Sequence, residues 1–328
     1  MNLVIGGTGF LGAEITRQLL SQGKKVRVLC RRKDGVPDGA EIFLGDIRQP
    51  ETLETACEGI ETVYHTASVP SITVFWKPFY ETNVAGTENV INVCLKKHVR
   101  KLIYTSSASV CFSCVPQLGV NESEPYPAKF LAHYPRSKAI AEKMVLDQAA
   151  KKSGLLVCSL RPHLIIGKHD RHLFPRLFQR AQRNRLFRVG SGDNMIDIIF
   201  VENAAVGHIQ AAEALTDESS PVNGSAYFLS QGQPVNCWDW INEILSMKGL
   251  PKVNRSISFR TAWNLGAAME LWWKICRFKT EPLMTRFLAA QLGQSHYLDI
   301  SKARRDFGYE LLLTMEEGMA QLAEQFRK

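Results

Sequence analysis

Two side chains four residues apart, Tyr134 and Lys138, have the types and the spacing that proton transfer requires. Residues at i and i+4 lie on one face of a helix, so the lysine ammonium can lie beside the phenol. A free phenol has a pKa of about 10, and ionising it at pH 7 costs roughly 4 kcal/mol. A cation at about 4 Å supplies energy of that order at an effective dielectric of about 20. The pair predicts a tyrosine that exchanges a proton with a substrate oxygen while a hydride moves.

A run of hydroxyl side chains precedes this pair by about 30 residues. It occupies residues 104–110, with the sequence Tyr-Thr-Ser-Ser-Ala-Ser-Val, at the end of an expected strand. Tyrosine and lysine at this spacing occur by chance on many helices, so the pair alone is weak evidence. The hydroxyl run strengthens it, because a hydroxyl at this place can hydrogen-bond the substrate oxygen.

Three glycines near the N-terminus, Gly6, Gly9 and Gly12, follow an apolar run and precede an amphipathic segment. Without side chains the backbone can turn tightly and approach a pyrophosphate, which then meets the positive end of the next helix. Such a turn between a strand and a helix predicts a dinucleotide site. A merely flexible glycine loop is the alternative, and the strand and helix pattern that follows disfavours it.

The end of the second expected strand selects between the two nicotinamide cofactors. An NAD site usually has an acidic residue there, about 20 residues after the glycines. Arg31 and Arg32 occupy this place, and guanidinium groups suit a 2′-phosphate through bidentate, charge-assisted contacts. We expect NADP(H) to be preferred, with NAD(H) as the other cofactor and a solvated basic turn as the other interpretation. Asp46, after the third expected strand, can accept a hydrogen bond from the adenine amino group.

These residues need a scaffold, and the hydrophobic pattern predicts one of alternating strands and helices. The expected strands are residues 3–5, 26–30, 40–44, 62–65, 101–104 and 155–160. The expected helices are residues 11–22, 51–57, 82–98 and 135–151. This alternation is typical of the α/β class with a Rossmann-type, doubly wound parallel sheet.

The alternation loosens after residue 162, and this suggests how the chain is divided. We predict an NAD(P)-binding Rossmann core over residues 1–165, which strand-like runs near 196–201 and 226–230 join. Residues 166–328 are expected to form a smaller C-terminal substrate-binding lobe. We expect the lobe to lie over the carboxyl ends of the strands, where open α/β sheets bind ligands.

Taken in order, the motifs resemble those of the extended short-chain dehydrogenases/reductases, in the branch that contains the 3β-hydroxysteroid dehydrogenases and the sterol-4-carboxylate decarboxylating dehydrogenases. The resemblance extends over nearly the whole chain and is carried by the glycine loop, residues 45–46, 65–67, 83–87 and 104–107, Tyr134-x-x-x-Lys138, and residues 160–162, 190–194 and 302–309. The final third also resembles bacterial 2-alkyl-3-oxoalkanoate reductases of long-chain olefin synthesis, in residues 257–262 and 285–289. One departure is Ile5, where the family often has threonine, and it is expected to cost a hydrogen bond in the loop.

The resemblance implies a role for each residue of the site. Tyr134 is the expected acid/base, Lys138 its pKa-lowering and ribose-holding partner, and Ser107 the hydroxyl that orients the carbonyl, with Ser106 as the alternative. Asn83 matches the helix asparagine that supports the proton path. The expected cofactor-binding residues are Gly6, Thr8, Gly9, Phe10, Leu11, Gly12, Arg31, Arg32, Asp46, Ile47, Thr66, Ala67, Tyr134, Lys138, Pro162, Leu164 and Ile165.

The predicted function is an NADP(H)-preferring oxidoreductase that interconverts a secondary alcohol and a ketone on a bulky apolar substrate. Both resemblances involve a 3-hydroxy or 3-oxo group beside an alkylated carbon that bears a carboxylate. The expected substrate is therefore an α-alkyl β-hydroxy or β-keto acid, such as a long-chain 2-alkyl-3-oxoalkanoate, or a 3β-hydroxysteroid. The alternatives are a nucleotide-sugar epimerase or dehydratase of the same fold and a non-catalytic NAD(P)-sensing protein. We also expect a homodimer.

Two segments combine aromatic and basic residues. Residues 173–188 are predicted to form one helix, and core packing with a solvated cationic face is the favoured interpretation. Residues 252–286 carry seven basic residues against Glu270 and Glu281, a net charge of seven minus two, or +5. This second segment is expected to be either an interfacial helix or lid, with peripheral membrane contact, or ordinary core packing with snorkelled lysines. Its basic residues are Lys252, Arg255, Arg260, Lys274, Arg277, Lys279 and Arg286.

Composition excludes several other classes. The chain has 328 residues, a net charge of +8 and 45% hydrophobic residues, as expected of a folded protein. It has no run of roughly 18 uninterrupted apolar residues, which disfavours an integral membrane protein. No nucleic-acid-binding motif accompanies the basic charge. Eight scattered cysteines and an N-terminus without an export signal predict a cytoplasmic protein, membrane-associated only if residues 252–286 contact a bilayer.

Metal and redox chemistry are not expected. Cys111 and Cys114 have the spacing of a redox motif or of half a zinc site, but the sequence offers no second pair. His169 and His172 lie close together without a carboxylate or thiol cluster at ligand spacing.

Overall fold

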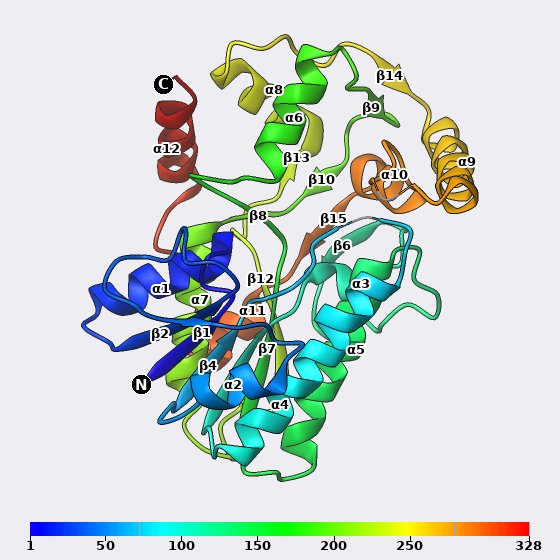
Figure 1. Ribbon diagram of the computed structural model, residues 1–328. Coiled ribbons are helices and arrows are strands. Elements are labelled where there is room, and N and C mark those ends of the chain that lie inside the picture. Colours follow the sequence, from blue (N-terminus) through cyan, green and yellow to red (C-terminus); the bar gives the residue numbers. More distant parts are fainter. Residues whose placement is uncertain (72, 279, 328) are drawn as a thin grey trace.

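The computed structural model describes residues 1–71, 73–278 and 280–327, and a seven-stranded sheet lies at its centre (Figure 1). Every pair of neighbouring strands in this sheet is parallel. In spatial order the strands are β12 (Ser225–Leu229), β7 (Leu156–Pro162), β5 (Lys101–Thr105), β4 (Thr62–His65), β1 (Asn2–Ile5), β2 (Val26–Cys30) and β3 (Glu41–Leu44). The strand order reverses between β1 and β4, which is where open α/β sheets bind ligands. The predicted Rossmann-type α/β class is confirmed.

Helices cover both faces of the sheet. On one face the buried apolar side chains come from α1 (Phe10–Ser21), α7 (Val201–Ala214) and α11 (Ser301–Phe307). On the other face they come from α2 (Pro50–Ala56), α4 (Gly86–Lys96) and α5 (His133–Ala150). Because both faces are covered, the inner strands are apolar along their length rather than alternating. One strand of the sheet, β12, and two of the helices that cover it, α7 and α11, come from beyond residue 166.

The helix expected over residues 82–98 begins earlier, at Lys77, ends at Lys96 and has three parts. A short α3 (Lys77–Phe79) continues into a π-helical turn, η1 (Tyr80–Ala85), and then into α4. Single π-helical turns inside a helix often occur at functional sites. Here the wide turn carries Asn83, one of the predicted site residues.

The remaining elements form the lobe, which lies beyond one end of the large sheet (Figure 1). It contains a four-stranded sheet of β13 (Val235–Asn236), β10 (Met195–Ile196), β15 (His296–Leu298) and β6 (Gln117–Val120), and two pairs, β8 (Leu164–Ile166) with β11 (Ile198–Phe200) and β9 (Arg188–Val189) with β14 (Ser256–Ile257). Its helices are α6 (Leu173–Gln182), α8 (Cys237–Met247), α9 (Phe259–Cys276), α10 (Arg286–Gly293) and α12 (Met315–Arg327). Among the described residues no helix is long and apolar enough to cross a membrane.

One of the two later runs predicted to join the large sheet does not join it. The run at 226–230 pairs with β7 as β12, as expected. The run at 196–201 does not join the large sheet, because β12 occupies the place beside β7. Instead β11 pairs with β8, and β10 pairs with β13 and β15. The run at 196–201 therefore connects the segment that follows β7 with the four-stranded sheet of the lobe.

The predicted helix over residues 173–188 is too long. The α6 helix ends at Gln182, and Asn184 adopts the left-handed conformation, with φ +53°. The chain then extends, and Arg188–Val189 pairs with β14. A strand partner far along the chain overrides the local helical pattern here.

Two histidines in the core around the large sheet, His65 and His208, are buried and uncharged. His208 of α7 lies within 2.7 Å of the Ala204 carbonyl through Nδ1 and 2.8 Å of the Thr105 hydroxyl through Nε2. A carbonyl only accepts, so Nδ1 carries the proton and Nε2 accepts from the hydroxyl. Burial lowers the pKa of His208 to about 4, and burial likewise lowers the pKa of His65 in β4 to about 3. Both rings are therefore uncharged at neutral pH.

The burial of His208 predicts that the stability of the protein depends on pH. The variant His208→Gln is expected to make this dependence weaker. The folded-state pKa of His208 lies below the ordinary value of 6.5, so the unfolded chain binds the proton first as the pH falls. Stability is lost between pH 6.5 and about 4, at roughly 1 kcal/mol per pH unit for this group. We expect the urea-derived unfolding free energy of His208→Gln to decline less steeply than that of the wild type. Exposed His98→Gln is the control, and equal slopes for wild type and His208→Gln would contradict the prediction.

Candidate active site

A cavity of about 660 Å³ lies where the carboxyl ends of the sheet strands meet the lobe. Its volume is in the range of sites for small molecules. The glycine-rich turn after β1 and Arg31 contribute one part of the lining, and Tyr134 and Lys138 contribute another. An apolar wall, formed by Phe112, Phe287 and Leu298, completes it on the side of the lobe. The cavity thus brings together side chains more than 150 residues apart in the sequence.

The glycine turn is shaped to receive a phosphate group. Gly6 has φ +89°, and the Gly9 amide donates to the Gly6 carbonyl over 2.9 Å. A Cβ on Gly12 would overlap that same carbonyl, so the first turn of α1 packs closely against the loop only because glycine is present. The N-terminus of α1 has no side-chain cap, which leaves its amides available to an anion.

Thr66, just beyond β4, hydrogen-bonds the end of β1 at Ile5. Its hydroxyl donates to the Ile5 carbonyl over 2.9 Å, and its amide donates to the same oxygen over 3.0 Å. The loop therefore receives a hydroxyl hydrogen bond from the neighbouring strand end. The hydrogen bond that Ile5 is expected to cost the loop stays a prediction.

Arg48, which the sequence analysis missed, holds the carboxylate of Asp46. Its Nη2 donates to Asp46 Oδ2 over 2.6 Å, and its Nε and amide donate to Oδ1 over 3.0 Å each. These hydrogen bonds, and the charges of Arg48 and Arg31, lower the pKa of Asp46. An adenine amino group must therefore share or displace these bonds. The Asp-x-Arg spacing was the signal available in the sequence.

The predicted cofactor residues separate into two groups. Among the described residues, the cavity lining includes Gly9, Phe10, Leu11, Gly12, Arg31, Thr66, Tyr134, Lys138, Pro162, Leu164 and Ile165. It does not include Gly6, Thr8, Arg32, Asp46, Ile47 or Ala67. Ala67 lies against Gly6, and buried Ile47 packs beside Gly86, so both shape the neighbouring backbone instead.

Tyr134 lies in the first turn of α5, with its phenol facing the cavity. Burial raises the pKa of Tyr134 above 10, and a hydrogen bond with Ser107 offsets part of that rise. The prediction of a lowered phenol pKa is therefore not supported by the protein groups around it. The phenol is protonated at neutral pH, as a proton donor must be.

Lys138 lies one turn further along α5, almost completely buried. Its ammonium donates to the Thr105 carbonyl at the end of β5 and lies 4.2 Å from the centroid of the Tyr104 ring. Burial lowers the pKa of Lys138 to about 7, and the carboxylate of Glu142 acts in the opposite direction. The ammonium is thus directed to a backbone carbonyl and an aromatic face.

The two candidate serines have different surroundings. Ser107 caps the short helix η2 (Ala108–Cys111), and its hydroxyl lies 2.9 Å from that of Ser109. Ser106 is buried, lines the cavity, and its hydroxyl has no hydrogen-bond partner within the described part of the chain. Of these two serines, Ser107 is the one that acts to lower the pKa of Tyr134, which supports Ser107 as the orienting hydroxyl.

Asn83 lies behind the cavity rather than in its lining. Its Oδ1 accepts from the Val69 amide over 2.7 Å, and its Nδ2 donates to the Ser137 hydroxyl over 2.9 Å. Ser137 in turn donates to the Tyr134 carbonyl over 2.8 Å. Asn83 therefore connects the loop after β4 to the first turn of α5, and it positions Tyr134 through the backbone.

A buried ion pair lies beneath Lys138. Glu142 accepts from Arg161 Nη2 over 2.7 Å, from the Ser159 hydroxyl over 2.6 Å and from the Tyr126 hydroxyl over 2.6 Å. Both charged side chains are buried, and Arg161 holds the pKa of Glu142 below its ordinary value against the cost of burial. The pair fixes α5 to β7 and places a negative charge one turn from the ammonium.

A stacked histidine pair, which the sequence analysis also missed, forms part of the cavity wall. The rings of His163 and His296 have centroids 4.9 Å apart and an interplanar angle of 17°. The Leu164 amide donates to His163 Nδ1, so His163 Nε2 carries the proton and donates to His296 Nδ1 over 2.9 Å. His296 Nε2 then donates to the Gln291 carbonyl. Every ring nitrogen is used while both rings are neutral, and burial lowers both pKa values.

The cysteine pair shows no sign of reactivity. Cys111 and Cys114 are buried, and burial raises the pKa of each thiol to about 11. Within the described ranges, no group of three or more His, Cys, Asp or Glu side chains is arranged to hold a metal ion. Of the basic residues predicted in 252–286, Lys279 lies outside the described residues.

Comparison with known proteins places this geometry in a family. The sequence profile described as the 3-beta hydroxysteroid dehydrogenase/isomerase family matches residues 3–260. The chain is 40% identical over 326 residues to a 2-alkyl-3-oxoalkanoate reductase of Shewanella oneidensis, covering 97% of this chain and 84% of that protein. It is 34% identical to a mouse sterol-4-alpha-carboxylate 3-dehydrogenase (decarboxylating), covering 98% and 90%.

Solved structures agree on the fold. The UDP-glucose 4-epimerase of Thermus thermophilus, solved in complex with NAD, superposes with a TM-score of 0.75. The superposition covers 99% of this chain and 98% of that one at 22% sequence identity. At this identity the likeness concerns the arrangement of elements. It agrees with the Rossmann-type α/β fold of this chain.

The buried Glu142–Arg161 pair predicts a strong loss of stability when one partner is removed. Glu142→Gln leaves the Arg161 guanidinium buried without a counter-charge, which costs about 3–5 kcal/mol. The double variant Glu142→Gln/Arg161→Met should recover much of this loss, because no charge remains buried. Urea unfolding followed by tryptophan fluorescence measures both, with Glu54→Gln at an exposed ion pair as the control. A double variant less stable than Glu142→Gln would refute this account of the pair.

Proposed function

The chain belongs to the 3-beta hydroxysteroid dehydrogenase/isomerase family, and we propose that it is an NADP(H)-preferring reductase/dehydrogenase of α-alkyl β-keto and β-hydroxy acids. It is an NAD(P)-dependent enzyme that acts on hydroxyl or keto groups, and its relatives are named as a reductase and a dehydrogenase. One observation carries the proposal. The phenol of Tyr134, the hydroxyl of Ser107 and the apolar wall line one cavity that also reaches the glycine turn.

The cavity lining supports a bulky apolar substrate. Phe112 and Phe287 meet edge to face with centroids 6.0 Å apart, and Leu298 lies in the same lining. The neutral His163–His296 pair adds ring surface without a net charge. The name of one relative describes a 3-oxo acid with an alkyl group at carbon 2, and the name of the other describes dehydrogenation at carbon 3 of a sterol carboxylate. A long-chain 2-alkyl-3-oxo acid combines these features, and a 3β-hydroxysteroid is the other member of the class.

The glycine turn fits the dinucleotide. A Cβ at Gly12 would fill the space against Gly6, and the uncapped amides of α1 face the cavity. These amides would hold the pyrophosphate, and Lys138 and Tyr134 line the same cavity. When bound, the nicotinamide supplies or accepts the hydride.

Side chains of the protein donate the proton and position the groups that exchange it. In the reductive direction the Tyr134 phenol, which burial keeps protonated, donates its proton to the substrate oxygen. Ser107 hydrogen-bonds that oxygen and keeps it within reach of the phenol. Lys138, with a pKa near 7, gains or loses a proton easily at neutral pH, and it would hold the ribose hydroxyls of the bound cofactor. Asn83 maintains the position of α5 through Ser137.

The preference for NADP(H) rests on the basic residues after β2. Arg31 lines the cavity, and Arg32 follows it on the exposed turn. Arg48 adds a third guanidinium beside Asp46, where Arg31 also acts on the carboxylate. Such a group of guanidiniums suits the 2′-phosphate, whereas an NAD site would have a free carboxylate.

Tyr134→Phe tests the proposed chemistry. We expect purified protein to oxidise NADPH in the presence of a 2-alkyl-3-oxo acid or a 3-ketosteroid, and the variant to lose about 10²–10⁴-fold in kcat. NADPH affinity, measured by fluorescence, should remain nearly unchanged, because the phenol transfers a proton rather than anchoring the nucleotide. Tyr80→Phe, at a half-exposed ring, is the matched control. Turnover of no substrate in the panel would reject the substrate class, and a variant that keeps more than about a tenth of kcat would reject the role of Tyr134.

Arg31→Ala combined with Arg32→Asp tests the cofactor preference. Loss of two charge-assisted contacts should lower kcat/KM for NADPH roughly 10²-fold, and less at high salt because the turn is exposed. Use of NADH should stay the same or improve, since a carboxylate can accept from its 2′-hydroxyl. The matched control is Lys24→Ala with Lys25→Asp, the same charge change on an exposed turn remote from the cavity lining. If the wild type prefers NADH, or the ratio survives the change, the arginines form only a solvated turn.

A further inference from the structure

Helix α9 packs into the lobe through its small residues. Its buried side is formed by Ala262, Gly266 and Glu270, one helical turn apart from each other. A Cβ on Gly266 would lie 2.5 Å from the Thr285 carbonyl carbon, so glycine allows α9 to approach the start of α10. Glu270 accepts from the amide, Nε and Nη2 of Arg286 over 2.8, 2.9 and 2.6 Å. The inner side of α9 is thus held by close backbone approach and one ion pair.

The outer side of α9 carries the large apolar residues. Leu265 is 47% exposed, Leu271 61%, Trp272 56% and Ile275 65%. Leu265, Trp272 and Ile275 follow the i, i+7, i+10 spacing of one helical stripe, with Ala268 and Leu271 beside them. Phe278, just beyond the helix, is 41% exposed. A surface helix normally turns such a stripe toward the core, and contiguous exposed apolar patches mark interaction sites.

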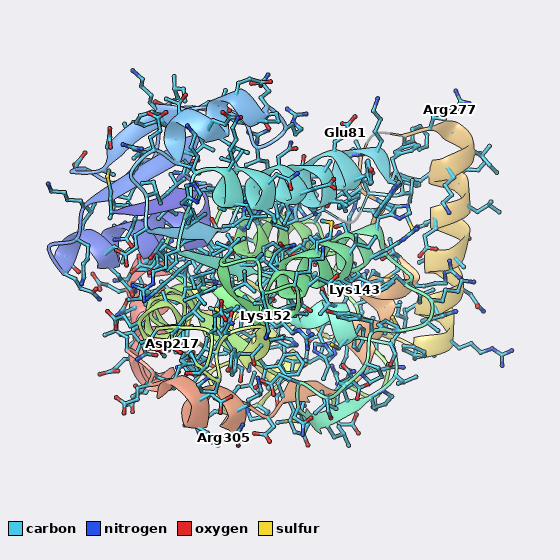
Figure 2. The ribbon with its side chains drawn as sticks, turned by 90° about the horizontal axis from the view of Figure 1, so that it is seen from below. Glu81, Lys143, Lys152, Asp217, Arg277 and Arg305 are labelled. Carbon is cyan, nitrogen blue, oxygen red and sulfur yellow. The ribbon has the colours of Figure 1, made fainter. Side chains whose placement is uncertain are left out.

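Basic residues border this apolar stripe. Arg260, Lys274 and Arg277 are exposed, and Arg277 ends the helix in the left-handed conformation. The one acidic residue in the sequence of α9, Glu270, is buried against Arg286. The outer side therefore combines tryptophan and aliphatic side chains with positive charge alone. Figure 2 shows α9 at one margin of the molecule, with Arg277 at its end and side chains projecting away from the other elements.

The segment after α9 connects this surface to the cavity. Glu281 accepts from the hydroxyl of Ser71, which lines the cavity, over 2.7 Å, and it forms an ion pair with Arg176 over 2.8 Å. From α10, Phe287 contributes to the apolar wall. The exposed stripe and the cavity thus belong to the same continuous piece of the lobe.

We propose that α9 docks on an anionic lipid membrane, with the stripe of Leu265, Leu271, Trp272 and Ile275 inserted at the level of the headgroups. Tryptophan and aliphatic residues on one helix side with flanking cations are the features of interfacial helices, and anionic headgroups are the matching charge. A second copy of the chain fits less well, because a twofold pairing of α9 would place the same cations against each other. The docking does not depend on the proposed function, whereas delivery of an apolar substrate from the bilayer to the cavity rests on it.

Co-sedimentation of the full chain with vesicles tests the docking. We expect binding to vesicles of phosphatidylcholine with phosphatidylglycerol and much weaker binding to phosphatidylcholine alone. Trp272→Ser with Ile275→Ser should weaken binding at least about tenfold, because two apolar side chains no longer leave water. Lys274→Gln with Arg277→Gln should weaken it about tenfold or more in the anionic vesicles, and high salt should do the same.

The matched controls carry the same changes elsewhere on the surface. Leu118→Ser with Leu312→Ser removes two aliphatic side chains that are 61% and 57% exposed. Lys143→Gln with Lys152→Gln removes two exposed charges, and Lys152 shares the left-handed conformation of Arg277. Both controls should bind vesicles as the wild type does, and thermal melting verifies that every variant is folded.

The outcomes are separable. A wild type that does not bind anionic vesicles, or controls that lose binding as much as the α9 variants, would overturn the proposal. A wild type that sediments alone as a dimer, which the Trp272/Ile275 variant disperses, would assign the stripe to a second copy instead. NADPH oxidation with a water-dispersed short-chain 2-alkyl-3-oxo acid should be unchanged in the α9 variants. Vesicle binding without any such activity would leave the docking in place and reject the proposed function.

Discussion

The buried ammonium of Lys138 is the constraint on which the arrangement of the site depends. A charge in the core is costly unless it is compensated, and here the Thr105 carbonyl, the Tyr104 ring and the nearby Glu142 share that task. These contacts fix α5 to the end of β5, while Glu142 and Arg161 fix it to β7. Tyr134, one turn earlier on α5, is consequently held in the lining of the cavity that Ser107 shares.

The lobe supplies the part of the cavity lining that the large sheet does not. Because β12 takes the place beside β7, the chain after β7 turns away and forms β8, which β11 joins. This turn carries His163 from the sheet to His296 in β15, and their stacked neutral rings connect the two layers. Phe112 and Phe287 then meet from different elements, and together they form the apolar wall of the cavity. The polarity of the cavity therefore changes from the glycine turn to the lobe.

Helix α9 shows how a lobe can use small residues and large residues for different purposes. Gly266 and Ala262 allow close packing, and the Glu270–Arg286 pair orients the helix, so no large side chain is needed on the inner side. The tryptophan and aliphatic residues are left on the outside with the cations. The sequence analysis left membrane contact and core packing as equal interpretations of this segment, because composition alone does not show which side of a helix is inward.

The sequence by itself determined the features that depend on short spacing. The glycine turn, the Tyr134–Lys138 pair, the hydroxyl run and the alternation of strands and helices are all local patterns, and local patterns select turn and helix geometry directly. Only the tertiary structure decided the pairing of residues 196–201, the raised pKa of Tyr134, the place of Asn83 behind the cavity and the contact of His163 with His296. Each of these depends on groups far apart in the chain, and burial, which controls both pairing and pKa, is set by which distant segments come to cover them.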